Sequence, residues 1–533
     1  MEEADYIIAG AGPAGCALAA RLIAAPDKPK VILVEAGRPK PSLLSVVPIG
    51  MAARVPWKSA ENYALQTIPQ TALNGRRGYV PRGRGLGGSS LINAMIYVRG
   101  QPQDYDGWAD QGCTGWGWDE VLPFFKRSVA NQRGEDLWHG ANGPLCVSDL
   151  ATQSPLSRAF LEAAQSCGVP YNSDFNGASQ EGVGFYQVFQ RDGRRLDAAR
   201  AYLGEAPYPE NLVVLSRTQA LSVAFEGRKA IGLHVRGAGG KRLIRARREV
   251  ILSAGAIASP KLLMLSGVGP AKHLTSLGIP VILDLPGVGR NLQDHLDYTV
   301  NVKIRSRGLL GYTPSAIAEV LTSLPAFRRG QGIMTSNVAE TGGFVRSSPD
   351  IDRPDLQLHC CIGLVDDHAR HFHVSTGIAL HVCVLRPESR GRITLTSGNP
   401  DDPALIDPNF LSEPQDLALL MRGARLAHAI LRAPALARYS GRPLYPVDDT
   451  DQTALEAAIR ERADSIYHPV GTCRMGIDDG AVVDPTLKVR GIDRLRIVDA
   501  SIMPTLISGN TQAPTAMIGE KAADLICRRD ASG

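Results

Sequence analysis

The sequence predicts an α/β fold in which a discontinuous, Rossmann-like nucleotide domain carries a second lobe with a mixed or antiparallel sheet flanked by helices. Three observations support this. A glycine-rich turn at residues 10–15 separates an apolar strand from an apolar helical run. Strand signals of a nucleotide domain recur in residues 1–100, 205–300 and 465–533. Between them, residues 301–464 alternate short strands with helices, which is typical of a mixed sheet with helices on it.

The N-terminal segment has the order strand, glycine turn, helix, strand, acid. Asp5–Ala9 is a short apolar strand, residues 10–15 have the pattern G-x-G-x-x-G, and an apolar helical run continues to Leu22. Val31–Val34 is the second strand, and Glu35 ends it. An acid at this distance from the turn accepts hydrogen bonds from the ribose hydroxyls of a dinucleotide. The segment therefore predicts dinucleotide binding.

Each glycine of the turn has its own task. Gly10 makes the tight turn, Gly12 lets a pyrophosphate approach the backbone, and Gly15 lets the helix pack on the sheet. The helix N-terminus offers amide donors and a positive partial charge to the phosphates. An acid at position 35 disfavours a 2′-phosphate, so NADP is not expected here. An isolated pattern of this kind would equally suit an ordinary glycine turn.

A second glycine-rich stretch, residues 83–100, reads GRGLGGSSLINAMIYVRG. Glycines such as Gly88 permit close backbone approach, and the serines and Asn93 offer short-range hydrogen bonds. Two such stretches imply a long cofactor that meets the backbone twice. A flavin dinucleotide, with a phosphate end and an isoalloxazine end, fits that need.

The remaining elements follow from apolar patterns and their boundaries. We expect strands at Glu249–Ser253, His381–Leu385, Arg392–Leu395 and Leu495–Val498, and helices at Pro260–Leu265, Pro414–Leu431, Thr453–Arg462 and Thr515–Cys527. Residues 306–340 contain Gly, Pro and Ser around an amphipathic stretch. This segment is either a mobile cover over the site or a surface excursion.

Composition excludes several classes of protein. The 533 residues are 44% hydrophobic and 21% charged with a net charge of +5, and no basic block indicates nucleic-acid binding. No apolar run approaches the length of a transmembrane helix. The first strand begins near residue 5, which leaves no room for a secretion signal, so we expect a cytoplasmic protein. Peripheral membrane contact remains open.

Cysteine and histidine patterns give no metal site. The nine cysteines include no C-x-x-C pair and are expected to be reduced, with Cys360 and Cys361 on opposite faces of a strand. His368, His371 and His373 form the nearest cluster. We interpret it as part of a surface loop rather than as a set of metal ligands.

Long motifs in the chain resemble the glucose–methanol–choline family of FAD-dependent oxidoreductases. They are residues 83–100, GAIASPKLLMLSGVG at 255–269, GVGRNLQDH at 287–295 and HPVGTCRMG at 468–476. The likeness extends from residue 5 to about residue 525, and its details are most similar to the choline dehydrogenase and alcohol dehydrogenase branch. The family implies FAD. From the separated strand signals we expect an FAD-binding domain of residues 1–160, 205–300 and 465–533, and a substrate-binding domain of residues 161–204 and 301–464.

The resemblance assigns cofactor contacts residue by residue. The pyrophosphate, ribose, flavin and adenine are expected to contact Gly10, Gly12, Pro13, Ala14, Gly15, Glu35, Ala36, Leu86, Gly88, Asn93, Ala94, Met95, Ile96, Ala220, Asp499, Ala500, Asn510 and Thr511. Some relatives attach FAD covalently through a histidine, and here that position is Ile92. We therefore expect FAD that dissociates.

Alcohol oxidation needs a base for the hydroxyl proton, and histidine has a suitable pKa. Of the histidines, His468 lies in a catalytic motif of the family, and Asn510 occupies the second catalytic position. His468 is expected to be the base and Asn510 to orient the substrate oxygen. Tyr467, Asn337 and Glu340 are weaker substrate-contact candidates. Glu340 would attract a cation such as choline, whereas a solvated or structural carboxylate is the competing interpretation.

The leading function is therefore oxidation of a primary alcohol to an aldehyde, with a quinone or other carrier favoured over O₂ as electron acceptor. A hydroxynitrile lyase is the main alternative, although Asn510 argues against it because such lyases are expected to carry a second histidine. Light-driven decarboxylation of fatty acids and FAD binding without catalysis are less favoured. The sequence does not name the alcohol or the oligomeric state.

Overall fold

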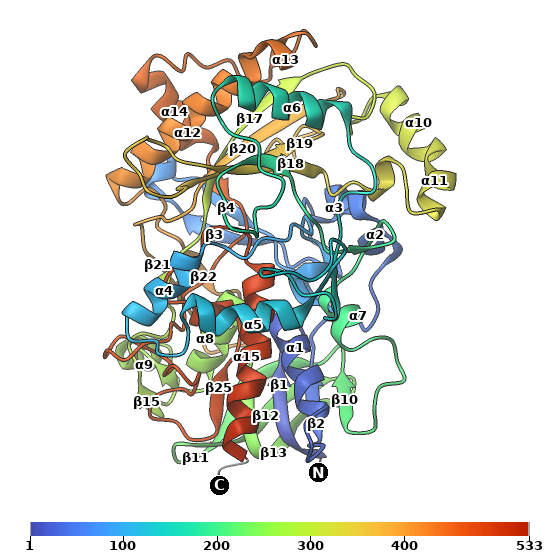
Figure 1. Ribbon diagram of the computed structural model, residues 1–533. Helices are drawn as coiled ribbons and strands as arrows, with labels where there is room; N and C mark the ends of the chain where they lie inside the picture. Colours follow the sequence, from blue (N-terminus) through green and yellow to red (C-terminus); the bar gives the residue numbers. More distant parts are fainter. Residues whose placement is uncertain (1, 531–533) are drawn as a thin grey trace.

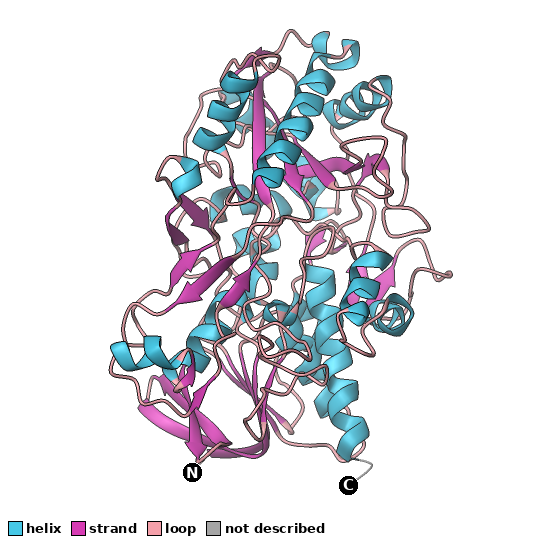
Figure 2. Ribbon diagram, turned by 90° about the vertical axis from the view of Figure 1, so that its left-hand side faces the viewer, coloured by secondary structure: helices cyan, strands magenta, loops and turns pink. Residues whose placement is uncertain are grey.

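The computed structural model describes residues 2–530 and contains two large β-sheets, one toward each end of an elongated molecule (Figure 1). Both termini lie beside the first sheet, at the lower end of that view. Helices cover the sheets at both ends, while loops and short strands occupy much of the middle (Figure 2). The predicted α/β class is confirmed.

The first sheet has the strand order β10-β2-β1-β13-β12-β11, with β25 added beside β13. The strands β10, β2, β1, β13 and β25 are parallel, whereas β12 and β11 continue the sheet antiparallel. The bounds are β1 (Glu2–Ala9), β2 (Val31–Val34), β10 (Leu212–Leu215), β11 (Gln219–Glu226), β12 (Lys229–Gly237), β13 (Gly240–Leu252) and β25 (Leu495–Ile497).

Apolar strand residues place this sheet in the core. Ile7 of β1 pairs with Ile32 of β2 and with Val250 of β13, and all four residues of β2 are buried. Continuous apolar strands of this kind are expected where both faces of a parallel sheet are covered. Helices α1 (Pro13–Ile23) and α15 (Gln512–Asp530) pack closely together, since a Cβ at Gly519 would lie only 2.4 Å from the carbonyl oxygen of Ala14.

The second sheet has the order β23-β17-β20-β19-β18-β7, with β24 beside β17, and its strands pair antiparallel. The bounds are β7 (Gly182–Phe185), β17 (Leu296–Lys303), β18 (Ala339–Val345), β19 (Leu356–Cys361), β20 (Gly377–Val384), β23 (Arg442–Pro443) and β24 (Asp464–Ser465). Helices α6 (Pro155–Ser166), α12 (Pro414–Arg432) and α14 (Gln452–Arg462) adjoin it.

Strand alternation gives β19 two different faces. Leu358 and Cys360 belong to the apolar core that also includes residues of α6, α12 and α14. His359 and Cys361 instead line the cavity between the two sheets. The adjacent cysteines therefore lie on opposite faces, as the sequence predicted. The predicted domain boundary at residue 300 would divide β17, which belongs as a whole to the second sheet.

Most predicted elements are present, with shifted ends. Strand β13 begins nine residues before the predicted start at Glu249, and α8 (Gly255–Leu265) begins five residues before the predicted start at Pro260. Proline has no N–H to donate to the carbonyl of Ala256, one turn earlier. The hydroxyl of Thr472 donates to that carbonyl instead, at 2.6 Å, so the helix continues through the proline.

Shorter elements complete the fold. The helices are α2 (Leu43–Val46), α3 (Met51–Arg54), α4 (Pro102–Asp110), α5 (Trp118–Ser128), α7 (Ala198–Tyr202), α9 (Ala271–Ser276), α10 (Pro314–Thr322), α11 (Leu324–Arg328) and α13 (Pro434–Ala437), with the 3₁₀ turns η3 (Gly88–Leu91) and η5 (Ala500–Ile502). The short strands are β3 (Leu65–Pro69), β4 (Arg77–Val80), β5 (Val129–Asn131), β6 (Leu145–Val147), β8 (Gln190–Arg191), β9 (Arg194–Arg195), β14 (Val268–Gly269), β15 (Leu283–Asp284), β16 (Arg290–Leu292), β21 (Gly391–Thr394) and β22 (Leu405–Asp407).

Cys16, Cys113, Cys146, Cys167, Cys360, Cys361, Cys383 and Cys473 are free thiols. Across residues 2–530, no helix combines the length and the apolar character needed to cross a membrane.

Candidate active site

One cavity of about 1190 Å³ lies between the two sheets. Its lining includes the carboxyl ends of β1 and β2, the turn after β13 and the start of β11 on one side, and residues of β18, β19 and β20 on the other. Ligands of open α/β sheets bind at the carboxyl ends of the strands. The segment at 306–340 contributes Leu310, Tyr312 and part of α10 to the wall, so it borders the cavity rather than lying apart from it.

The first glycine turn separates into cavity-lining and packing residues. Gly10, Gly12, Pro13 and Ala14 line the cavity, and no side chain caps the N-terminus of α1 at Gly12. Its uncapped amides suit a phosphate group. Gly15 lies outside the lining, and a Cβ there would come 2.0 Å from the carbonyl oxygen of Gly10. Gly15 therefore serves close packing, as the glycine pattern predicts, and does not line the cavity as a cofactor contact, which the resemblance implied.

Glu35 is held by backbone amides. Its carboxylate accepts hydrogen bonds from the amides of Ala11 at 3.2 Å, Gly37 at 2.7 Å and Gly85 at 3.0 Å. Burial raises the pKa of this carboxyl group, and the three amides oppose the rise. Glu35 and its neighbour Ala36 both line the cavity. The carboxylate thus joins both glycine-rich stretches at the edge of the predicted ribose site.

In the second glycine-rich stretch, Gly88 and the run Asn93–Ile96 line the cavity. Leu86 does not, which corrects the prediction that it runs along the flavin. Its side chain is 4% exposed within the main hydrophobic core, and its amide donates to the carbonyl of Arg38. Apolar packing accounts for this leucine.

The side chain of Asn93 is already engaged by the protein. Its oxygen accepts from Arg195 at 2.9 Å and from the amide of Met95 at 3.2 Å, and its nitrogen donates to Gln512. Met95 has a left-handed φ of 59°, a conformation that costs a residue with a Cβ roughly 1–2 kcal/mol. These contacts therefore hold a strained stretch of backbone against the cavity.

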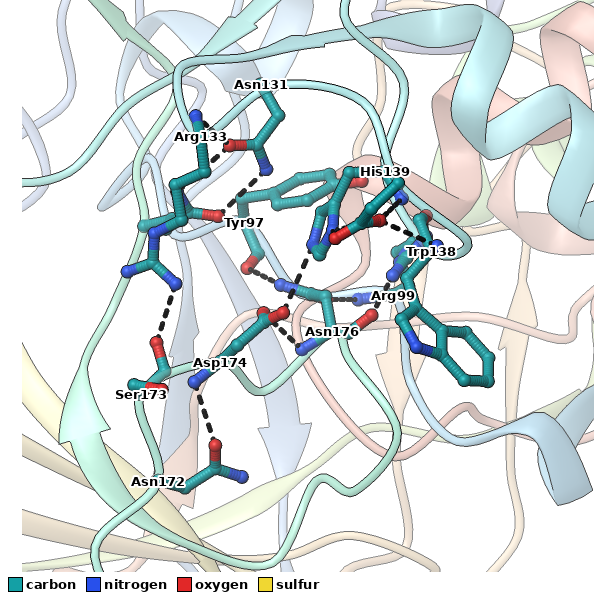
Figure 3. Close-up of polar contacts among 12 residues, drawn as sticks. Tyr97, Arg99, Asn131, Arg133, Trp138, His139, Asn172, Ser173, Asp174 and Asn176 are labelled. Carbon is teal, nitrogen blue, oxygen red and sulfur yellow. Dashed lines mark hydrogen bonds and ion pairs between the residues drawn. The ribbon is translucent and has the colours of Figure 1, made fainter.

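A polar network lies immediately after this stretch, around Tyr97 and Arg99 (Figure 3). The side chain of Asn176 accepts from the amide of Arg99 at 2.9 Å and donates to the carbonyl of Tyr97 at 3.0 Å. Asp174 accepts from the amide of Asn176 at 3.0 Å and lies 3.3 Å from the buried ring of His139. The network fixes the backbone that leaves the cavity wall.

The other predicted cofactor contacts lie on the cavity wall as well. Ala220, Asp499, Ala500 and Thr511 all line it. Asp499 accepts from the amide of Gly255 and the hydroxyl of Ser259 through one oxygen, and from the amide of Ser501 through the other. Its carboxylate joins the start of α8 to η5.

His468 and Asn510 meet in the cavity, although they lie forty-two residues apart. The nitrogen Nε2 of His468 is 3.2 Å from Nδ2 of Asn510, and Oδ1 of Asn510 accepts from Gln357 of β19 at 3.0 Å. Asp294 accepts from the backbone amide of His468 at 2.7 Å. Contacts from β19 and from the segment just before β17 thus position this pair.

A chain of hydrogen bonds determines which nitrogen of His468 carries the proton. Nε2 of His295 lies 3.0 Å from the carbonyl oxygen of Leu385, which only accepts, so this nitrogen is protonated. Nδ1 of His295 is then an acceptor, and Nδ1 of His468, 2.9 Å away, is the donor. Nε2 of His468 is left with its lone pair directed at Asn510, whose Nδ2 donates to it.

Electrostatics keep both imidazoles neutral. Burial lowers the pKa of His295 to about 4. Burial also lowers the pKa of His468 well below its ordinary value, and the rings of His295 and His359 and the charge of Arg82 add to the effect. His468 is therefore an unprotonated base at neutral pH. The sequence did not indicate the role of His295, although His295 ends the GVGRNLQDH motif of the family.

His359 is a further residue that the sequence did not indicate. It lines the cavity and is 3% exposed, and burial lowers its pKa to about 3. Neither ring nitrogen has a hydrogen bond of ordinary geometry with a described residue, although the side chain of Asn510 lies close enough to oppose the fall in pKa. The available signal was the alternation of polar residues along β19, where Gln357 and His359 share one face.

Two predicted substrate contacts are wrong. Asn337 is fully buried and donates to the carbonyls of Ala94 and Ala339, each at 3.0 Å. Glu340 is 2% exposed and accepts from the amide of Ser154, the hydroxyl of Ser157 and the hydroxyl of Ser336. Neither side chain lines the cavity. Burial raises the pKa of Glu340, and its contacts make it a structural carboxylate.

The surface-loop interpretation of the histidine cluster fails for His368. Its side chain is 8% exposed, and its ring bridges the hydroxyl of Tyr467 and the carboxylate of Asp464. Both Tyr467 and His368 line the cavity. Among the described residues no cluster suits a metal ion.

Comparisons with known proteins agree with this architecture. Two family models described as GMC oxidoreductase match residues 4–297 and 387–519. An alcohol dehydrogenase [acceptor] from Pseudomonas putida is 48% identical over 98% of this chain and 96% of its own length. The mitochondrial choline dehydrogenase of Homo sapiens is 41% identical over 98% and 90%. An FAD-dependent oxidoreductase from Chaetomium thermophilum superposes with a TM-score of 0.87 at 27% identity, covering 99% and 100% of the two chains.

The cavity also fits FAD on its own evidence. It has a volume of about 1190 Å³, has a glycine-lined, uncapped helix N-terminus at one side, and includes Gln512, whose buried Nε2 has no protein partner among the described residues. The site residues and the matches together establish FAD as the cofactor. The chain belongs to the GMC oxidoreductase family.

Proposed function

We propose that the protein oxidises an uncharged primary alcohol to the aldehyde, with His468 as the base and Asn510 orienting the substrate oxygen. The observation that carries this is the unprotonated Nε2 of His468, which faces Asn510 in the cavity. Bound FAD supplies the acceptor for the hydride. General-base catalysis by a positioned histidine contributes typically about 10²–10⁴-fold to a rate.

The two side chains have complementary tasks. His468 takes the hydroxyl proton on Nε2, while its Nδ1–H stays hydrogen-bonded to His295. Asn510 has a second donor hydrogen for the substrate oxygen, since its Oδ1 is fixed by Gln357. Removing the proton from the oxygen prepares the adjacent carbon to release a hydride.

The charges around the cavity favour a neutral substrate over choline. The carboxylates that line it are Glu35, Asp401 and Asp499. Glu35 and Asp499 are held by backbone amides, and Asp401 pairs with Arg236. Glu340, which the sequence offered for a cation, is enclosed elsewhere. The similarity to an alcohol dehydrogenase [acceptor] supports the same conclusion.

We also propose a cytoplasmic enzyme that passes electrons to a quinone or a similar carrier. The quinone is supported by an aromatic group beside the cavity: Tyr312, which lines the cavity, meets Phe372 at 4.9 Å, and Trp57 stacks on Phe372 at 5.9 Å. Phe372 is 56% exposed, and Leu321 nearby on α10 is 70% exposed. Exposed apolar patches of this kind mark ligand entry or contact with a membrane surface.

The test is anaerobic mixing of the purified holoenzyme with alcohols while the flavin absorbance is followed. Aliphatic, aryl and glycol alcohols and choline form the panel. Bleaching by an uncharged class supports the proposal, and bleaching by choline alone contradicts the substrate assignment. Reoxidation in air distinguishes an oxidase. Cyanide release from a cyanohydrin without bleaching would establish the lyase alternative.

FAD is expected to dissociate on denaturation. Ile92, at the position where some relatives attach FAD, lines the cavity and is 3% exposed, and its hydrocarbon side chain forms no covalent bond. Acid precipitation should release all of the yellow colour into the supernatant. Colour that remains in the washed pellet would contradict this expectation.

His295 is expected to act through His468 rather than on the substrate. Replacing His295 by leucine removes the acceptor that fixes the tautomer of His468, and we expect alcohol-dependent flavin reduction to slow about 10- to 100-fold, as for other partners that orient an active imidazole. His295→Gln offers an amide oxygen to the same N–H and should recover part of the rate. Equal losses in both variants, with unchanged FAD content, would argue against the tautomer role.

A further inference from the structure

Tyr467, His368 and Asp464 form a second hydrogen-bonded chain at the cavity. The hydroxyl of Tyr467 is 2.6 Å from Nδ1 of His368, and Nε2 of His368 is 2.9 Å from Oδ2 of Asp464. Because a carboxylate only accepts, Nε2 of His368 is protonated, and its Nδ1 accepts the phenol proton of Tyr467. The oxygen of Tyr467 therefore keeps its lone pairs for a donor in the cavity.

Both residues of the Tyr467–His368 contact have strained backbone conformations. Asp367, His368 and Ala369 are consecutive left-handed residues with φ of 46°, 58° and 62°, and Tyr467 has φ of 78°. Non-glycine residues adopt this region only where the surroundings impose it, and such residues gather at functional sites. Arg82 helps to hold Tyr467 in this conformation, since its guanidinium donates to the Tyr467 carbonyl at 2.6 Å.

The loop that carries His368 is held from the opposite side as well. Asp366 accepts from His373 at 2.7 Å and from the hydroxyl of Tyr445 at 2.8 Å. The side chain of Asn301 donates to the carbonyl of Val365 at 2.9 Å. These contacts fix the loop against β17 and the segment after β23, so the ring of His368 is directed at Tyr467.

The chain through His468 offers no exit for a proton. Its inner end is the carbonyl of Leu385, reached through His295. Its other neighbour, Asn510, is an amide that leads to the amide of Gln357. A proton on Nε2 of His468 can therefore leave only through the cavity itself, which Tyr467 also lines.

We propose that Tyr467, His368 and Asp464 relay protons between the cavity and solvent. A proton that reaches the oxygen of Tyr467 sends the phenol proton to Nδ1 of His368, and the resulting imidazolium is paired with Asp464. The chain ends at Asp464, whose side chain is 10% exposed and from which the proton leaves.

The need for a proton relay depends on the electron acceptor. The proposed relay rests on the proposed alcohol oxidation. Oxidation of an alcohol RCH₂OH to RCHO releases two electrons and two protons. A quinone takes up both electrons and both protons and becomes the quinol. Two ferricenium ions take only the electrons, so both protons must pass from the cavity to solvent.

The experiment compares Tyr467→Phe and His368→Gln holoenzymes with the unmodified protein, using ferricenium or a soluble quinone as acceptor. Turnover with ferricenium is expected to fall about tenfold or more, since proton transfer then lacks its carrier, and its solvent deuterium isotope effect should rise. In His368→Gln, turnover with the quinone and the rate of anaerobic flavin reduction should change little. Added imidazole should restore ferricenium turnover in His368→Ala.

Tyr445→Phe is the matched control. It removes a phenol that binds the same loop through Asp366 but does not line the cavity, and it should leave turnover with both acceptors unchanged. Equal losses with both acceptors, or a matching fall in anaerobic reduction, would overturn the relay. If no alcohol reduced the flavin of the unmodified protein, the proposed function would be overturned instead.

Discussion

Replacing His468 by alanine is expected to slow flavin reduction by alcohol about 10²–10⁴-fold, the usual contribution of a general base. The variant loses the unprotonated Nε2 that faces Asn510, and the next nitrogen in the chain belongs to His295, whose Nδ1 is turned toward His468. Single-turnover anaerobic mixing measures the rate directly, without the electron acceptor. FAD content should remain unchanged, because the cavity loses only a side chain at its substrate end.

The control is His234→Ala on β12, an exposed histidine outside the cavity wall, which should reduce at the normal rate. The pH dependence gives a second check. The pKa of His468 is lowered by burial, and the neutral imidazole is the active form. Reduction should therefore be independent of pH through neutrality and fall only well below the ordinary histidine pKa. A fall centred near 6.5 would contradict the environment described for His468.

Replacing Gly12 by valine is expected to weaken FAD binding markedly while the fold remains intact. Gly12 has an ordinary φ of −76°, and a Cβ there would meet no atom within 4 Å. The added side chain would instead occupy the space beside the N-terminus of α1, where the pyrophosphate approaches the backbone. Overpacking of about 1–3 kcal/mol corresponds to roughly ten- to hundredfold weaker binding.

The measurements are the FAD-to-protein ratio after purification, the dissociation constant from fluorescence titration of the apoprotein, and far-ultraviolet circular dichroism. Gly107→Val in α4 is the matched control, because a Cβ there also meets no atom within 4 Å but lies outside the cavity. It should retain full FAD content. A yellow Gly12→Val protein with normal affinity would show that the phosphates bind elsewhere.

The sequence predicts well those elements that are specified by contiguous motifs. The strand–turn–helix–strand unit around residues 10–15 is present, and β2 has the predicted bounds. The distinct tasks of Gly12 and Gly15 follow from local backbone geometry, which a short motif specifies by itself. Most other elements were predicted with ends shifted by a few residues, because caps and prolines are satisfied by distant side chains such as Thr472.

The sequence predicts less well which individual side chains of a long motif line the cavity. Leu86, Asn337 and Glu340 lie close to lining residues in the sequence, yet each points into packed protein. Alternation along strands and turns sends neighbouring side chains to opposite sides. A motif therefore predicts which segment reaches the cavity, but it does not predict which side chains of that segment line it.

The sequence by itself determined the fold class, the family and the two residues proposed for catalysis, because those properties reside in continuous motifs. Only the tertiary structure decided what these residues contact. His295 and His468 are 173 residues apart, and His368 and Tyr467 are 99 apart. Such hydrogen bonds depend on the pairing of strands and on how loops return across the second sheet. The tautomer of His468 and the Tyr467–His368–Asp464 chain therefore follow from long-range packing, which no local pattern of residues records.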